Sequence, residues 1–217
     1  MRGTGLEIGA LHQPAPVPNL CKVEYCDCAT KEEIIKFFPE LSIGELVDVQ
    51  YIADLDKDGL VQFEDGKFDF IIANHVIEHV ANPIRVLREI FRIIKKGGYA
   101  VISAPDKNFT FDKNRALTPF THLLDDYQKI VSEITDEHYI DFLRAVHPEV
   151  FNRSECEIES AISSVKNRRG YVHVWDSSSF KQFIELSLDI LKINAVCCFE
   201  STGENNNLEY FSVWQKG

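Results

Sequence analysis

One short segment of this sequence joins an apolar run to a group of acid–base side chains. Residues 68 to 73 are β-prone and too short for an independent helix, and His75, Glu78 and His79 follow them. Histidine titrates near neutral pH, so His75 is a candidate proton acceptor, and His122 further along the chain is a second. A single histidine is more often a hydrogen-bonded structural group, so the position of each in the fold must decide.

The string from His75 to His79 also reads H-x-x-E-H, the pattern of an inverted zinc protease. That site needs both histidines on one face of a helix. Here the string directly follows a strand, and the helix-start signals Asn82 and Pro83 come after it, which disfavours the protease. Metal-assisted chemistry with a further, distant histidine stays open as an alternative, although the sequence predicts no resident metal.

Composition limits the classes of function. The chain has 217 residues, 45% of them hydrophobic, which suits one domain with a substantial core. A net charge of −11 disfavours a nucleic-acid partner, because such binding needs clustered Lys and Arg. The sequence shows no signal peptide and no apolar run of transmembrane length, so we expect a cytoplasmic protein without a membrane partner. Six cysteines lack C-x-x-C spacing and are expected to be reduced, mostly buried thiols.

The elements that must position these side chains alternate between strands and helices. A capping box from Thr30 to Glu33 and the pair Asn82–Pro83 open two helices, and the Gly97–Gly98 pair is expected to close the second. Alternation with nearly continuous apolar strands predicts a parallel sheet covered on both faces, followed by an antiparallel hairpin turning at 203–207. The strands are expected at 5–10, 23–28, 47–53, 68–73, 99–104, 192–201 and 208–215.

Residues 106–170 depart from this alternation. They are polar, rich in aromatic residues and histidine, and hold helical pieces at 118–134 and 136–146. We interpret them as a helical insertion, or lid, over the strand ends within a single domain of residues 1–217. Ser177 or Ser178 is expected to cap the helix that follows.

A mostly parallel sheet that finishes in an antiparallel hairpin resembles the class I S-adenosylmethionine-dependent methyltransferases. The family's first motif is matched by residues 6–10, and its acid after the second strand by Asp27. Asp54–Leu55 match the positions after the third strand, and residues 69–83 match the fourth-strand motif. The resemblance covers most of residues 5–105 and implies a Rossmann-like α/β fold with seven strands. Stretches between 104 and 123 also resemble a bacterial methyltransferase-11-like subgroup often found near glycosyltransferases.

The resemblance implies S-adenosyl-L-methionine as cofactor and a set of contacts at the strand ends. It implies that Asp27 accepts bonds from the ribose hydroxyls, that Glu7 meets the ammonium group and that Asp54 takes the adenine amino group. The other cofactor positions that it implies are Gly9, Ala10, Leu55, Asn74, His75 and His79. Methyl transfer is an aligned SN2 displacement, for which His75 and His122 are the candidate bases.

The acceptor implied by the resemblance is a small molecule, such as a sugar or a natural-product intermediate. One departure from the family pattern keeps a second hypothesis open. The first motif usually carries two or three glycines that let the backbone approach the ligand, and here only Gly9 is present, followed by the proline-rich loop 11–19. This favours, as the alternative, a catalytically degenerate cofactor-binding or regulatory module.

Overall fold

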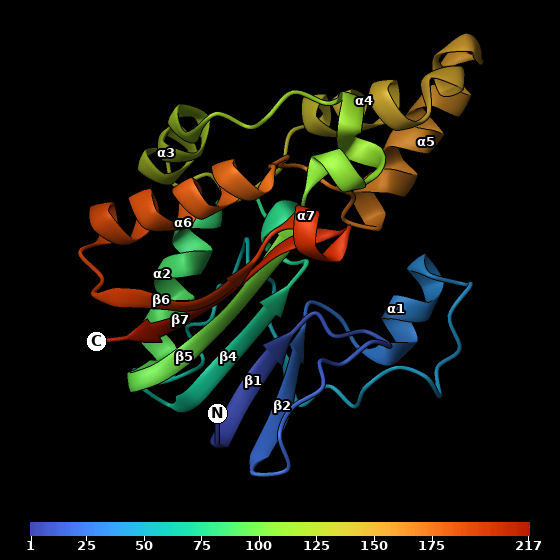
Figure 1. The fold of residues 1–217 in the computed structure, drawn as a ribbon. Helices are drawn as coiled ribbons and strands as arrows, with labels where there is room; N and C mark the ends of the chain where they lie inside the picture. Colours follow the sequence, from blue (N-terminus) through green and yellow to red (C-terminus); the bar gives the residue numbers. More distant parts are fainter.

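The computed structural model describes residues 1–217 and contains one seven-stranded sheet in the order β3-β2-β1-β4-β5-β7-β6 (Figure 1). Strands β1 to β5 run parallel, and β7 lies antiparallel between β5 and β6. The predicted sheet, mostly parallel with a C-terminal antiparallel hairpin, is therefore confirmed. The strands are β1 (Gly3–Ile8), β2 (Cys21–Asp27), β3 (Tyr51–Ile52), β4 (Phe68–Asn74), β5 (Ile94–Pro105), β6 (Ala195–Ser201) and β7 (Glu209–Lys216).

Two helix starts follow their sequence signals. Thr30 and Glu33 form the predicted capping box at the start of α1, and the Asn82 side chain accepts a bond from the Arg85 amide at the start of α2. The α-helices are α1 (Lys31–Phe37), α2 (Pro83–Ile93), α3 (Phe120–Gln128), α4 (Asp136–Val146), α5 (Glu155–Asn167), α6 (Ser177–Leu191) and α7 (Gly203–Asn206). Short 3₁₀ turns are η1 (Ile77–His79), η2 (Lys107–Phe109), η3 (Phe111–Asn114) and η4 (Pro148–Asn152).

The predicted end of α2 at the glycine pair is wrong. The helix ends at Ile93, and Ile94 already pairs with Phe68 at the start of β5. The pairing then shifts register before Tyr99, and Gly97 has a positive φ of 78° in this irregular stretch. The glycines therefore lie in an irregular, bulged part of β5 rather than at a helix end. Pairing with β4 begins at Ile94, before the apolar residues at helical spacing come to an end.

The second half of the chain differs from prediction in four further places. Helix α4 has the predicted bounds, whereas α3 is shorter than predicted and α5 was not foreseen as a separate helix. Asp176, rather than a serine, caps α6, because its carboxylate accepts the Ser179 amide at 2.7 Å. The turn before β7 holds the one-turn helix α7.

The sheet is covered unequally. On one face α2, α3 and α6 enclose the main core, to which Phe180 and Phe183 of α6 and Ile84 and Leu87 of α2 contribute. The other face has a small cluster centred on Phe70, against which the proline-rich loop packs. The expectation that both faces are covered is wrong here, because β1 and β2 are joined by that loop rather than by a helix.

The cysteines are all free, but they are not mostly buried as expected. Cys26 is buried inside β2, whereas Cys28 lies beyond the end of that strand and is exposed together with Cys156 and Cys198. No helix is long and apolar enough to cross a membrane.

Candidate functional site

The parallel strands bring the predicted polar residues to one edge of the sheet. Glu7 stands at the end of β1, Asp27 at the end of β2 and Asp54 two residues after β3, and His75 directly follows β4. Because β1 to β4 are parallel neighbours, their carboxyl ends share this edge. Side chains far apart in the sequence are thus collected where open α/β sheets bind ligands.

The end of β1 has the features of a binding turn. Gly9 has φ of 70°, in the left-handed region that favours glycine, and its amide donates to the Cys26 carbonyl at 2.9 Å. One Glu7 carboxylate oxygen accepts the Ala15 amide of the proline-rich loop at 2.9 Å, and the other is buried without a partner. Burial raises the pKa of Glu7. The unpartnered oxygen fits a donor group supplied by a ligand.

The carboxylates after β2 and β3 surround an arginine from the second half of the chain. The Arg169 guanidinium contacts Asp54, and its other terminal nitrogen lies 3.7 Å from Asp56. Burial would raise the pKa of Asp54, but Arg169 holds it below its ordinary value. Asp27 is buried and makes no ion pair with Arg169, and its burial raises its pKa. Its Oδ1 accepts the Cys28 amide at 2.7 Å, so Oδ2 is the oxygen available to a hydroxyl donor.

His75 occupies the centre of the strand edge. Its φ of 52° is unusual for a residue other than glycine, and its amide donates to the Ser103 carbonyl of β5. Its Nε2 lies 2.8 Å from a carboxylate oxygen of Glu209, at the start of β7, and its Nδ1 lies 3.6 Å from Glu78. Burial would lower the pKa of His75, but the bond to Glu209 and the charge of Glu78 raise it.

Glu78 is a fully buried carboxyl group without a hydrogen-bond partner for either oxygen. Burial raises its pKa to about 7, because the charged form loses its hydration. The nearest titratable groups are the rings of His75 and His79, at 3.6 and 3.8 Å. A carboxyl group in this state can hold or release a proton near neutral pH, beside the candidate base.

Residues 169–173, which we call the strap, cover this end of the sheet. The Val172 and His173 amides both donate to the Glu78 carbonyl, at 2.8 and 3.1 Å, and His79 contacts the Arg169 carbonyl through Nδ1. His79 also packs edge-on against Tyr171. The strap thus connects the loop after β4 to the acids after β3.

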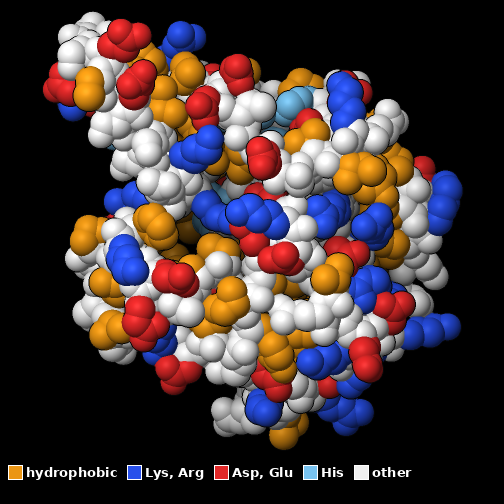
Figure 2. All heavy atoms as spheres, turned by 180° about the vertical axis from the view of Figure 1, so that it is seen from behind, with side chains coloured by type: hydrophobic (Ala, Val, Ile, Leu, Met, Phe, Trp, Pro, Cys, Tyr) orange, Lys and Arg blue, Asp and Glu red, His pale blue; other side chains and the backbone are white.

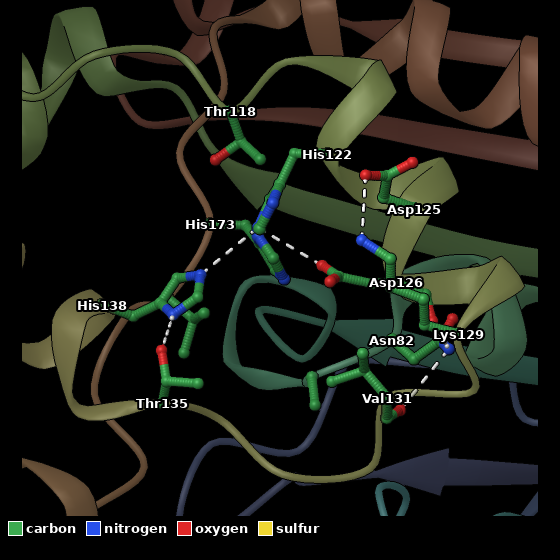
Figure 3. Close-up of polar contacts among 12 residues, drawn as sticks. Asn82, Thr118, His122, Asp125, Asp126, Lys129, Val131, Thr135, His138 and His173 are labelled. Carbon is green, nitrogen blue, oxygen red and sulfur yellow. Dashed lines mark hydrogen bonds and ion pairs between the residues drawn. The ribbon is translucent and has the colours of Figure 1, made fainter.

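His122 lies in a different group of side chains, shown in Figure 3. Its Nε2 is 3.3 Å from both Asp126 and the Nε2 of His138, and its ring centroid is 5.9 Å from that of His173. His173 is buried and its Nε2 donates to the Val80 carbonyl. His122 therefore joins α3 and α4 to the strap, and none of its polar partners belongs to the strand-edge group.

The remaining predicted cofactor positions, Ala10, Leu55 and Asn74, lie at or just after the ends of β1, β3 and β4. Ala10 is buried just after Gly9, and the Leu55 side chain belongs to the main core. The Asn74 side chain accepts a bond from the Ser103 hydroxyl at 3.3 Å. No group of three or more histidine, cysteine or acidic side chains has a geometry that could hold a metal ion.

Sequence reasoning missed Glu209 and Arg169. Glu209 begins the predicted last strand, and an antiparallel strand starts at the edge where its parallel neighbours end, so the hairpin topology was a usable signal. Arg169 follows α5, which was not foreseen, and nothing in its local sequence indicates a target 115 residues away.

The α4–α5 lobe stands away from the body of the molecule. Figure 2 shows it projecting at the upper left, with a hollow between it and the body. A groove of about 460 Å³ between α1 and α5 includes Lys36, Ser160 and Arg168 among its lining residues. Arg168 bridges the groove by contacting Glu40 and lying 4.7 Å above the Phe38 ring. The lobe thus meets α1 mainly through exposed side chains.

Residues 3–153 match the family model described as a methyltransferase domain. The chain belongs to this methyltransferase family. Its fold agrees with a solved protein of Pyrococcus horikoshii, with a TM-score of 0.50 and 16% identity over 100% of this chain and 83% of that one. The family match and the fold confirm the class I methyltransferase assignment.

Other relatives of this methyltransferase domain match less of their own length. The CurJ carbon methyltransferase matches with a TM-score of 0.49 and 17% identity. The match covers 100% of this chain but only 49% of that protein, so this chain spans about half of its length. An uncharacterised protein of Methanocaldococcus jannaschii is 37% identical over 46 residues, 21% of this chain and 22% of that protein.

Proposed function

We propose that this protein transfers a methyl group from S-adenosylmethionine to a hydroxyl or amine of a small molecule, such as a sugar or a natural-product intermediate. The observation that carries the proposal is the pairing of His75 with Glu209 at the strand edge that also holds Glu7, Asp27 and Asp54. A proton acceptor and the acids suited to a nucleoside cofactor therefore share one site. The net charge of −11 argues against a nucleic-acid acceptor.

The residues present fit the cofactor in its expected orientation. Asp27 offers Oδ2 to the ribose hydroxyls, because its Oδ1 already accepts the Cys28 amide, and the unpartnered oxygen of Glu7 suits the ammonium group. The turn at Gly9 brings backbone close to the ligand without a side chain in the way. The bound cofactor supplies an activated methyl group, so the protein's task is alignment and proton acceptance.

His75 is the proposed base, acting through Nδ1. With Glu209 accepting the proton on Nε2, the Nδ1 lone pair is free to take a proton from the acceptor. The imidazolium that results lies between two carboxyl groups, Glu209 on one side and Glu78 on the other. Both carboxylates stabilise that charge, because they lie within 4 Å of the ring. The insertion 106–170 and the strap serve as the lid that excludes water.

The deciding experiment is calorimetry with S-adenosylmethionine and S-adenosylhomocysteine. We expect both to bind, and Asp27→Ala to weaken binding at least about tenfold because ribose hydroxyls lose their acceptor. Asp58→Ala, at an exposed turn outside the site, is the matched control and should bind as the wild type does. Failure of both ligands to bind at millimolar concentration would refute the proposal.

One observation supports a second candidate function, a cofactor-binding or regulatory module without turnover. Arg169 already occupies acids expected to contact adenosine, and the first motif is poor in glycine. Binding of S-adenosylhomocysteine combined with no methyl transfer to a panel of sugars, phenols and amines would favour this module. Methyl transfer to any of them would exclude it.

A further inference from the structure

Arg169 joins the two ends of the candidate site through contacts that the proposed chemistry does not use. Its guanidinium contacts Asp54 and approaches Asp56, both after β3, whereas its carbonyl contacts His79 after β4. Its side chain is about one-third exposed, so it lies at the mouth of the site rather than in the core.

Its contacts coincide with the polar partners expected for adenosine. Asp54 is the carboxylate expected to take the adenine amino group, and it is the closest ionic partner of Arg169. The positive charge also acts on the buried Asp27, the expected ribose acceptor. The Arg169 side chain therefore occupies the acid that the adenine amino group would need.

Arg169 lies close to the end of a helix that packs loosely against the rest of the protein. It lies two residues beyond the end of α5, has φ of 49° in the left-handed region, and is followed by Gly170. Helix α5 buries none of its residues and is separated from α1 by the groove described above. Helix α5, which has no buried residues, can move at small cost, and Arg169 moves with it.

We propose that Arg169 is an autoinhibitory latch: its ion pair with Asp54 occupies the adenosine end of the cofactor site, and cofactor binding requires its release from Asp54. Release also frees the strap from the acids after β3. Cofactor binding then loosens the cover over Glu78 and His75, so the acceptor enters after the cofactor. This inference rests on the proposed function, because it concerns the same site.

Calorimetry with S-adenosylhomocysteine tests the latch through Arg169→Ala. If the open state is the minor one in the wild type, removing the latch should tighten binding about tenfold, because apparent affinity is reduced by the competent fraction. Arg153→Ala, at an exposed arginine of the same lobe that makes no ion pair, should bind as the wild type does. Weaker binding by Arg169→Ala would show that the arginine is a cofactor contact, and unchanged binding would show no latch.

Hydrogen exchange of the wild type gives a second measurement that needs no variant. The Val172 and His173 amides should exchange faster when S-adenosylhomocysteine is bound, because the strap loses its anchor on Asp54. Slower exchange would overturn the latch, since Arg169 would then be closing over the ligand. Absence of any binding by the wild type and by Arg169→Ala would refute the proposed function itself, whereas binding with equal affinity refutes the latch alone.

Discussion

At the residue scale, the proposed chemistry rests on the pairing of His75 with Glu209. Glu209 fixes which ring nitrogen carries the proton and raises the pKa of His75 against the effect of burial. A base must be neutral to act, so activity should rise with pH through the pKa of His75.

Removing the Glu209 charge should shift the pH range over which activity rises. We expect Glu209→Gln to lower the pKa of His75, so that the acid limb of the pH–rate profile shifts to lower pH, and to reduce kcat at least about tenfold because the imidazolium loses its partner. S-adenosylhomocysteine affinity should not change. Glu204→Gln in the same turn, at an exposed side chain, is the control. An unshifted acid limb would contradict the role of Glu209.

His75 itself can be replaced without disturbing its unusual backbone. Asparagine tolerates the left-handed region, so His75→Asn keeps the loop while removing the base. We expect kcat to fall roughly 10²-fold or more, the usual worth of a general base, with cofactor binding retained. Steady-state kinetics measure the change in kcat, and calorimetry measures cofactor binding. Unchanged kcat would show that His75 only shapes the loop.

The site could be predicted in part because its acids follow strands. Glu7, Asp27 and Asp54 are visible as polar residues after apolar runs, and parallel pairing collects them. Arg169 could not be foreseen, because its position depends on how the α4–α5 lobe folds back over the sheet. His122 was selected for its residue type alone, and the structure places it with His138 and His173.

At the scale of elements, the insertion is held to the strap by Arg115. Its buried guanidinium bonds Asp112 and Asp141 and also donates to the Tyr171 and Val172 carbonyls. These bonds join η3 and α4 to the segment that covers Glu78. Arg115 is itself buried, so these bonds are shielded from water.

Breaking this network should cost much of the lid's stability. Arg115→Met leaves the buried Asp112 carboxylate without its partner, and we expect unfolding to become easier by about 3 kcal/mol. Urea denaturation measures the change, and Arg144→Met at an exposed helical position is the control. A loss below about 0.5 kcal/mol, the range of ordinary surface changes, would contradict the assignment.

The junction between β1 and β4 makes a sharp packing prediction. A Cβ on Gly5 would lie 2.1 Å from a carbon of the Phe70 ring, closer than atoms can approach. Gly5→Ala should therefore destabilise the protein by roughly 1–3 kcal/mol, the usual cost of overpacking. Gly44→Ala is the matched control, because nothing lies within 4 Å of its added carbon. Equal melting temperatures for the two variants would refute this packing.

Element prediction succeeded where local signals agree with pairing. The capping box at Thr30 and the Asn82–Pro83 start were right because cap and turn chemistry act locally. The end of α2 was wrong because β4 recruits Ile94 into the sheet before the glycine pair. Helix α5 was missed because it has no buried residues, and so no apolar stripe to reveal it.

At the scale of the whole molecule, buried neutral histidines set the response to acid. Burial lowers the pKa of His79 to about 4 and of His173 to about 3, whereas both have ordinary values near 6.5 once unfolded. The unfolded chain therefore takes up protons first as pH falls. Their stabilising contribution is complete above about pH 6.5 and is lost progressively below it.

This predicts a protein that loses stability in mild acid. Between pH 6.5 and 4, each histidine should lower the free energy of unfolding by up to about 1.4 kcal/mol for each unit that the pH falls. Glu78 partly offsets this loss, because its raised pKa makes the folded protein bind a proton more readily than the unfolded chain. Denaturation across this range measures the slope, and His173→Gln should reduce it while His147→Gln at an exposed site should not. Equal slopes for all three proteins would contradict this account.

The place of β7 in the sheet has a consequence for synthesis of the protein. The partner of the proposed base is encoded 134 positions after His75, and it reaches the site only when β7 inserts between β5 and β6. At 5–20 residues per second, a ribosome needs on the order of ten seconds to cover that interval. During that time β5 has an unpaired edge, so a nascent chain is exposed to aggregation and has no activity. A protein truncated before Glu209 would therefore be incompletely folded rather than a weakly active enzyme.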